Sequence, residues 1–528
     1  MQKLSPDSIR PFIARLVFKE IKGDGITKHR QKEVKLNGTL ISPNTSILIT
    51  FLSLGAVVLL LTTSKTLRMG ILTFLLILIL LSTTKTHVGS WNDQSRMALI
   101  ESLVEQKSFI IDDSVYFRTG DKMFVNGHFY SDKPPMLQVI GAGIYYFLRM
   151  QGIELGGRFD RAYYWLTLLT IGAGWLVCTI TFYLSLHLTN IKEKYGFLLT
   201  IALALGTLFY PWSLVFNAHS IAASLLFIGF YFLLKARQLE NKKLHLLGAG
   251  FLISLAGTID YAVTVYYIGF LIYLLTEKKS RRQAIYFILP LLITAVPALK
   301  LNHMITNDFI PITLHKEFWL YPGSPWGDGE ALCGMKFNKG VFLIRYAFHA
   351  LIGHSGLFSY NPVLLLAFFC LCKEAVRKNA FYKEARVVVV ASVLLLMYYL
   401  LMTSDYSGLS YSIRWFVVLI PIVFFFMYNF FSQTNLKKEI LFSVLLIISA
   451  GNSILGALNP WSCGWRREGP GCSQSRQISN WDHFRRFQNL IHKKIPGKKQ
   501  SPCSACRTEG IQNQTTTLGE NKTVSRMS

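Results

Sequence analysis

One acidic residue, Asp93, stands in the run Asn92-Asp93-Gln94-Ser95-Arg96, shortly after a long apolar block. A carboxylate beside apolar walls at a membrane surface holds a proton more tightly than one in water, which suits removal of a proton from a hydroxyl group. The same position suits the N-cap of the following helix, where the carboxylate accepts hydrogen bonds from free backbone N–H groups. Spacing alone leaves both interpretations open and favours the N-cap.

Lys133 lies in the run Tyr130-Ser131-Asp132-Lys133-Pro134-Pro135, where a cation directly precedes a rigid turn. Proline is compatible with the first turn of a helix, so a helix is expected to begin here. The ammonium group is suited to pairing with a lipid-linked phosphate. The alternative is that Lys133 reaches toward lipid head groups while Asp132 caps the helix.

Arg414 follows the polar stretch 405–412 at the start of another apolar block. A guanidinium group at the mouth of a helical bundle is a good phosphate ligand, although Arg414 fits a head-group anchor equally well. Asp260 lies at the end of an apolar block, where an ionisable residue costs little and a structural role is favoured. No zinc site is expected from four histidines that lack suitable spacing, which are His303, His315, His349 and His354.

The elements that carry these residues are apolar blocks in a chain of 528 residues. The chain is 51% hydrophobic and 16% charged, with a mean hydropathy of +0.35. A soluble protein carries about 25% charged residues, and the blocks are long enough to span a hydrocarbon core. The net charge of +26 sits in short loops, as the positive-inside rule places it. No nucleic-acid motif accompanies it, so no nucleic-acid partner is expected.

The blocks predict an all-α, polytopic membrane bundle of about 11–12 spans. Their expected ranges are 47–63, 69–84, 163–188, 196–212, 216–234, 246–260, 262–276, 285–300, 355–372, 387–402, 413–430 and 438–457.

Five basic loops alternate correctly with these spans and are expected on the cytoplasmic side. They lie at 192–194, 235–243, 278–282, 373–386 and 437–438. Residues 85–162, 301–354, 403–412 and those after 458 then face the opposite side. The apolar stretch 134–149 would invert this order if it crossed, so it is expected to lie in the outer interface.

The expected domains are a basic leader (1–46), a membrane domain (47–460) with outer loops 85–162 and 301–354, and a polar, basic, partly disordered tail (461–528). The side of the N-terminus stays open, because the two apolar blocks before residue 85 and the basic leader conflict. A disulfide or free thiols are expected in the tail rather than zinc, at Cys463, Cys472, Cys503 and Cys506.

In combination, the motifs resemble the membrane glycosyltransferases of the GT-C type. The similarity is closest to the branch of lipid A aminoarabinose transferases and protein O-mannosyltransferases. The residues that carry it are Asp93, the motif 130–135, the run Gly-Leu-Phe-Ser-Tyr-Asn-Pro (356–362), and Tyr411-Ser-Ile-Arg-Trp (411–415). Together they cover roughly residues 69–457. The leader and the segment 458–528 have no counterpart in that family.

The resemblance implies an inverting transferase that moves a sugar from a polyprenyl-phosphate donor to a hydroxyl of a lipid, glycan or protein acceptor. It implies Asp93 as general base, with Lys133 and Arg414 near the donor phosphate. A plasma or inner membrane of a cell envelope, with the active site outward, is the implied location. Some relatives bind a divalent metal and others do not, so no cofactor is assigned. Candidates for a second acid or an acceptor contact are Asp112, Asp113, Asp132 and Asp260, and further pocket residues are Tyr130, Tyr360 and Tyr411.

Three rival functions remain at this point. A flippase or transporter of lipids or sugar-lipids tends to show paired repeats and charges near the middle of its spans, whereas here the charges gather at outer ends. An O-antigen-ligase type of enzyme would place its largest outer loop late in the chain, and here the richest loop is the first. An inactive relative serving as a scaffold is the third.

Overall fold

The computed structural model describes residues 64–156, 160–278, 280–326, 339–403, 405–432 and 434–464. All of them lie in one compact unit. The predicted leader, the first apolar block and the tail beyond residue 464 lie outside the described residues, so the expected domain boundaries stay predictions.

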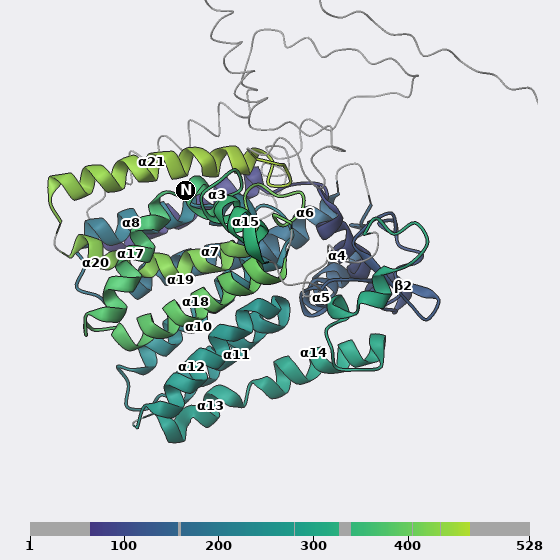
Figure 1. Ribbon diagram of the computed structural model, residues 1–528, viewed down its shortest axis with the longest axis horizontal. Coiled ribbons are helices and arrows are strands. Elements are labelled where there is room, and N and C mark those ends of the chain that lie inside the picture. The colour runs from purple at the N-terminus through teal and green to yellow at the C-terminus, as the bar shows by residue number, and fades with distance from the viewer. Residues whose placement is uncertain are drawn as a thin grey trace, which may run out of the picture. The chain divides into compact units, whose positions relative to one another are not determined.

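Within the described residues, six helices are long and apolar enough to cross a membrane, or up to seven if one bent pair counts as a span. Helices dominate, and a single two-stranded sheet accompanies them (Figure 1). The all-α polytopic membrane bundle is therefore confirmed. The six are Lys65–Thr83, Arg161–Leu186, Ala218–Ala236, Tyr382–Met402, Arg414–Phe431 and Leu436–Leu458, and the bent pair is Arg281–Ile288 with Leu291–Thr306.

The number of full-length spans is smaller than predicted because several apolar blocks form short or interrupted helices. The block 196–212 is interrupted after Gly206, and the block 355–372 is interrupted at Pro362, whose nitrogen has no hydrogen to donate. Hydropathy records how apolar a block is and not where its backbone breaks.

The helices in chain order are α3 (Lys65–Thr83), α4 (Trp91–Glu101), α5 (Met136–Met150), α6 (Arg161–Thr167), α7 (Ala173–Leu186), α8 (Glu193–Leu205), α9 (Phe209–Trp212), α10 (Ala218–Ala236), α11 (Lys243–Ile259), α12 (Thr264–Thr276), α13 (Ala284–Ile288), α14 (Leu291–Thr306), α15 (Gly340–Leu351), α16 (Leu357–Tyr360), α17 (Val363–Val376), α18 (Tyr382–Met402), α19 (Leu419–Phe424), α20 (Tyr428–Phe431) and α21 (Leu436–Leu458). The strands are β1 (Lys122–Val125) and β2 (His128–Ser131), which pair antiparallel.

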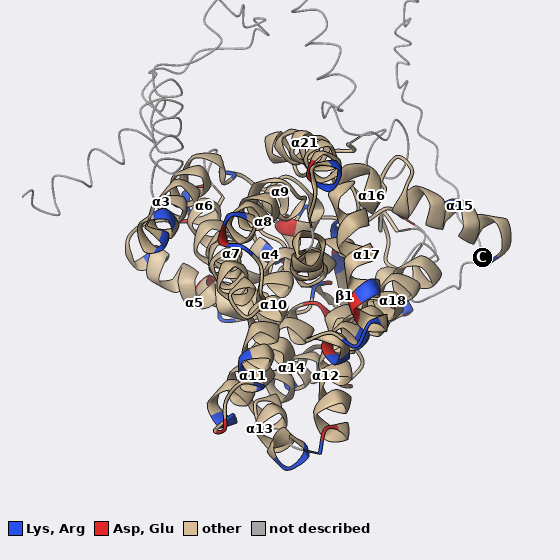
Figure 2. Cartoon of the chain, turned by 90° about the vertical axis from the view of Figure 1, so that its left-hand side faces the viewer, with Lys and Arg blue, Asp and Glu red and all other residues tan. Residues whose placement is uncertain are grey.

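The basic loops gather at one end of the bundle, where ion pairs join them to one another and to neighbouring helix ends. Figure 2 looks onto this end and shows Lys and Arg at the ends of several helices. The shared end is the arrangement that the alternation of charge predicted. The pairs are Lys65–Glu193 (3.3 Å), Arg237–Glu384 (3.0 Å) and Lys383–Glu277.

The first long loop, residues 85–162, folds at the opposite end into α4, the β1–β2 hairpin and α5 (Figure 1). The second loop packs against it. The indole Nε1–H of Trp326 donates to the carbonyl oxygen of Gly120 at 2.9 Å, and Trp326 contacts Trp91 edge-on at 6.3 Å between ring centroids. A small apolar cluster also joins the loops, made by Met123, Ile305, Ile312 and Trp319.

Helix α5 is the segment expected to lie in the membrane interface. It buries one face, including Leu137, Gly141 and Tyr145. Its other face leaves Phe147 69% and Met150 66% exposed. A helix of 15 residues with one such apolar face is suited to lying in the interface rather than spanning the bilayer.

Candidate functional site

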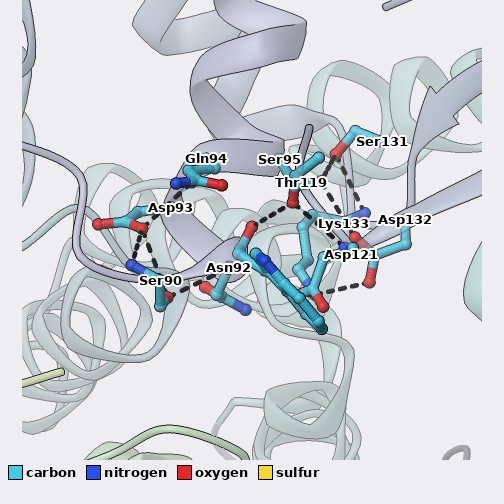
Figure 3. A network of polar contacts seen from close by, with 12 residues as sticks. Ser90, Asn92, Asp93, Gln94, Ser95, Thr119, Asp121, Ser131, Asp132 and Lys133 are labelled. Carbon is cyan, nitrogen blue, oxygen red and sulfur yellow. Dashed lines mark hydrogen bonds and ion pairs between the residues drawn. The ribbon is translucent and has the colours of Figure 1, made fainter. Parts of the chain in front are cut away.

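Helix α4 begins with a capping box that involves Asp93. Ser90 is the N-cap, and Asp93 occupies the third helical position, from which its side chain accepts from the Ser90 backbone N–H at 2.8 Å. This corrects the N-cap interpretation of Asp93, since a side chain at the third position reaches back to the cap backbone. The carboxylate also accepts from the backbone N–H of Gly89 at 2.9 Å and from the Tyr163 hydroxyl at 2.9 Å. Figure 3 shows it at the start of α4.

Burial gives the Asp93 carboxyl group a basicity suited to proton transfer. The side chain is fully buried, and desolvation raises its pKa to about 6, against the opposing effect of its backbone and Tyr163 hydrogen bonds. A carboxylate of this pKa is largely ionised at pH 7 yet accepts a proton readily. Because its oxygens are already occupied, one of the present donors has to move before a substrate hydroxyl takes its place.

Lys133 is held between two carboxylates just ahead of α5. Its ammonium group lies 2.7 Å from Asp121 and 2.6 Å from Asp132. The Ser95 hydroxyl, on α4, donates to Asp132 at 3.1 Å and lies 2.7 Å from the Ser131 hydroxyl. Asp132 therefore ties the hairpin to α4 and does not cap α5, which has no side-chain cap. Figure 3 shows these residues together.

Arg96 is a site residue that the sequence did not single out. It lies three residues after Asp93 and is 3% exposed. Burial lowers its pKa to about 10, while the carboxylates of Asp132, Asp260 and Asp121 act in the opposite direction. Its Nη1 donates to Gln138 on α5 at 3.4 Å. The spacing from Asp93 was the available signal, because residues three apart share one face of a helix.

Arg414 brings a second guanidinium group to the same region. It is 8% exposed, its Nη1 donates to the carbonyl oxygen of Ser407, and its guanidinium lies 5.3 Å from the centre of the Trp461 ring. The carboxylates of Asp405, Asp121 and Asp93 attract it electrostatically. The charge of Asp121 therefore acts on both Lys133 and Arg414, which are far apart in the sequence.

Asp260 pairs with a histidine in this region. The Nδ1 of His219 lies 2.7 Å from a carboxylate oxygen of Asp260, and both residues are mostly buried. Arg414 and Arg96 act electrostatically on His219. His219 was missed because it follows the N-cap Asn217 at the start of an apolar helix, where a polar residue is unremarkable. The charged cluster, as we call it, consists of Arg96, Asp121, Asp132, Lys133, His219, Asp260 and Arg414.

Several buried N–H donors in and beside the charged cluster have no acceptor among the described residues. They are the Nε atoms of Arg96 and Arg414, Nε2 of Gln138 and Nε1 of Trp461. A buried donor without an acceptor is costly, and all four groups offer hydrogen atoms rather than lone pairs. The chemistry that fits such a set is an oxygen-rich anion.

Other candidates from the sequence lie in structural contacts. Asp112 holds the hairpin, 2.8 Å from His128 Nδ1 and accepting from the Phe129 backbone N–H at 2.8 Å. Asp113 is exposed in a turn. Tyr130 pairs with Met123 in the β1–β2 register. The Tyr360 and Tyr411 rings are buried and meet edge-on, with centroids 4.9 Å apart.

In the described part of the chain, no three His, Cys, Asp or Glu side chains are grouped so that they could hold a metal ion. The carboxylates of the charged cluster are instead engaged with the Lys133 ammonium and with His219.

The chain was compared with family models, curated proteins and solved structures. No family model matches the chain, and no curated protein matches it. The chain is similar to the crystal structure of ArnT from Cupriavidus metallidurans bound to undecaprenyl phosphate, with 11% sequence identity and a TM-score of 0.46. The match covers 78% of this chain and 64% of that one, so the chain spans less than two thirds of that structure.

ArnT is a GT-C lipid A aminoarabinose transferase. It therefore belongs to the class that the sequence motifs resemble. At this identity and TM-score the similarity transfers neither activity nor residue roles, and the proposals below are argued from the described residues.

Proposed function

We propose that the protein is a membrane glycosyltransferase that moves a sugar from a polyprenyl-phosphate donor to an acceptor hydroxyl, with inversion at the anomeric carbon. The observation that carries this proposal is the set of buried, unsatisfied N–H donors on and around two arginines, Arg96 and Arg414. A lipid phosphate supplies the missing acceptor oxygens. Arginine is well suited to this task because its planar guanidinium group can donate two parallel N–H hydrogen bonds to phosphate oxygens.

The two arginines are better placed than Lys133 to make the first phosphate contacts. Lys133 already neutralises Asp121 and Asp132, whereas both arginines retain a free Nε–H. We therefore assign Arg96 and Arg414 as direct ligands. Lys133 contributes positive charge nearby and reaches the phosphate by giving up one of its carboxylates.

Asp93 is proposed as the general base. The acceptor oxygen forms a bond to the anomeric carbon as the bond from that carbon to the phosphate oxygen breaks, and the acceptor proton passes to Asp93. The phosphate leaves as an anion that the arginines stabilise, so no acid is needed for departure. A single displacement of this kind inverts the anomeric centre.

Charge and a disulfide both support an active site on the outer side of the membrane. The basic loops lie at one end of the bundle, which the positive-inside rule assigns to the cytoplasm. The charged cluster lies at the other end, where Cys463 is disulfide-bonded, and disulfides persist in oxidising compartments. We propose that the active site faces outward, in a plasma or inner membrane, toward acceptors of the cell envelope.

The decisive experiment incubates the purified full-length protein with a panel of polyprenyl-phosphate sugars and measures released polyprenyl phosphate. The expected result is release from at least one donor, lost in Asp93→Asn and in Arg96→Gln, with both variants folded by size-exclusion chromatography. Reconstitution in liposomes distinguishes a transferase from a flippase. Movement of labelled polyprenyl phosphate between leaflets without release of sugar would show that the protein is a flippase and not a transferase.

A further inference from the structure

The chain beyond the last span folds back over the charged cluster. Residues 458–464, which we call the strap, leave α21 and make backbone contacts with two outer segments. The carbonyl oxygen of Leu458 accepts from Lys85 Nζ at 3.0 Å, and that of Pro460 accepts from the Tyr411 backbone N–H at 2.9 Å. The strap is therefore anchored on the loop before α4 and on the loop before Arg414.

Trp461 is the central side chain of the strap and is 2% exposed. Its ring lies over the Arg414 guanidinium at 5.3 Å and meets Trp212 edge-on at 5.0 Å. A cation over the face of an indole ring is attracted by the ring's quadrupole, and more strongly where water is excluded. The ring therefore restrains the orientation of Arg414.

The same ring presses on the loop that holds Asp93. A Cβ atom at Gly89 would lie 2.3 Å from Trp461 Cδ1, so only glycine fits between the loop and the ring. The backbone N–H of Gly89 donates to the Asp93 carboxylate at 2.9 Å. Trp461 thus touches both the partner of the proposed base and the proposed phosphate ligand.

The far end of the strap packs closely against the bundle. Cys463, two residues after Trp461, is 7% exposed. The neighbouring Gly464 lies against the Tyr360 hydroxyl, which a Cβ atom would approach to 2.2 Å. This close packing holds the end of the strap beside Trp461.

We propose that Trp461 is a positioning residue that holds Arg414 in its phosphate-binding orientation. This inference rests on the proposed function. It goes beyond that function, because it assigns a role in donor binding to a segment that the motif resemblance does not cover.

The first test measures binding of radiolabelled undecaprenyl phosphate to the full-length protein in detergent. Trp461→Leu should raise Kd about tenfold or more, because the quadrupole is lost, whereas Trp461→Phe should stay within about threefold. Trp319→Leu, which removes an equally buried indole away from Arg414, is the matched control and should bind as the wild type does. Wild-type protein that fails to bind would count against the proposed function, whereas tight binding by Trp461→Leu would overturn the positioning role alone.

A second test avoids the risk that Trp461→Leu misfolds. Fluorinated tryptophans at position 461 keep the shape of the ring, and each added fluorine weakens its quadrupole. Kd should then rise with each added fluorine, and this rise should vanish when Arg414 is replaced by Gln. A flat series overturns the proposal.

Discussion

The Asp121 carboxylate lies 2.7 Å from the Lys133 ammonium group and also attracts the Arg414 guanidinium, which comes from a segment nearly three hundred residues later in the chain. The charge of Asp121 therefore acts on two binding residues that were predicted from separate motifs. Asp121 itself was not predicted, because it lies in an ordinary turn-forming stretch between Gly120 and Lys122.

Removing the charge of Asp121 should destabilise the protein. The Lys133 and Asp121 side chains are 14% and 11% exposed, and breaking a buried pair costs about 3–5 kcal/mol because the remaining charge loses its partner. Asp132 stays beside Lys133, so we expect Asp121→Asn to fall at the low end of that range. Thermal unfolding in detergent measures it. Asp121→Asn/Asp132→Asn should cost more than the sum of the two single changes, because Lys133 then keeps no carboxylate, and a merely additive loss would contradict the shared pairing.

The pH dependence of transfer should report the pKa of Asp93. The ionised carboxylate is the proton acceptor, so kcat/KM should rise with pH through about 6 and then level off. The check is a profile from pH 4.5 to 8 with saturating acceptor. A rate that falls across this range would exclude Asp93 as the base.

The contribution of Asp93 to stability should fall as pH rises, whereas kcat/KM should rise. The folded pKa of about 6 exceeds the ordinary value of 3.8, so between these values the folded state binds more protons than the unfolded state. The contribution of Asp93 to stability is therefore greatest at low pH and declines as pH rises from about 4 to about 6, by up to about 3 kcal/mol. Melting curves of the wild type and Asp93→Asn should differ in slope over this window and run parallel above it.

Tyr163→Phe should raise the pKa of Asp93 further. The Tyr163 hydroxyl donates to the carboxylate at 2.9 Å, and this hydrogen bond lowers the pKa of Asp93. Its loss should cost about 1–2 kcal/mol of stability and move the rising limb of the kcat/KM profile to higher pH. Tyr164→Phe serves as the control, because it removes a hydroxyl of the same helix that donates to the carbonyl oxygen of Leu81 at 2.7 Å and not to Asp93. An unmoved limb in Tyr163→Phe would show that another group sets the profile.

A change at the opposite end should affect stability and not chemistry. Glu384 is buried and accepts from Arg237 and Tyr273. Glu384→Gln should cost about 1–2 kcal/mol, because the partly exposed Arg237 can turn to water. The kcat and KM of the folded fraction should match the wild type. A selective change in donor KM would reveal coupling between the two ends.

The all-α membrane class followed from hydropathy, and the shared end of the basic loops followed from charge, because both are sums over many residues. The breaks after Gly206 and at Pro362 depend on single positions, and they changed how many helices have full length. In the site, Lys133, Asp132, Asp260 and Arg414 were all named from the sequence and lie in the charged cluster. Asp121, His219 and Trp461 were missed, since each is ordinary in its own segment and acquires meaning only through partners far away in the chain. Arg96 was also missed, although its spacing from Asp93 was a local signal.

Asp93 and Arg96 lie on one rigid element, three residues apart on α4, with the axial separation of about 4.5 Å that helical geometry dictates. If Asp93 is the base and Arg96 binds the leaving phosphate, the rigid helix fixes the distance between the proton acceptor and the phosphate ligand. A larger acceptor then has to be accommodated by the surrounding loops, so variation in acceptor choice among related chains should map to the second loop, 301–354, and leave α4 unchanged.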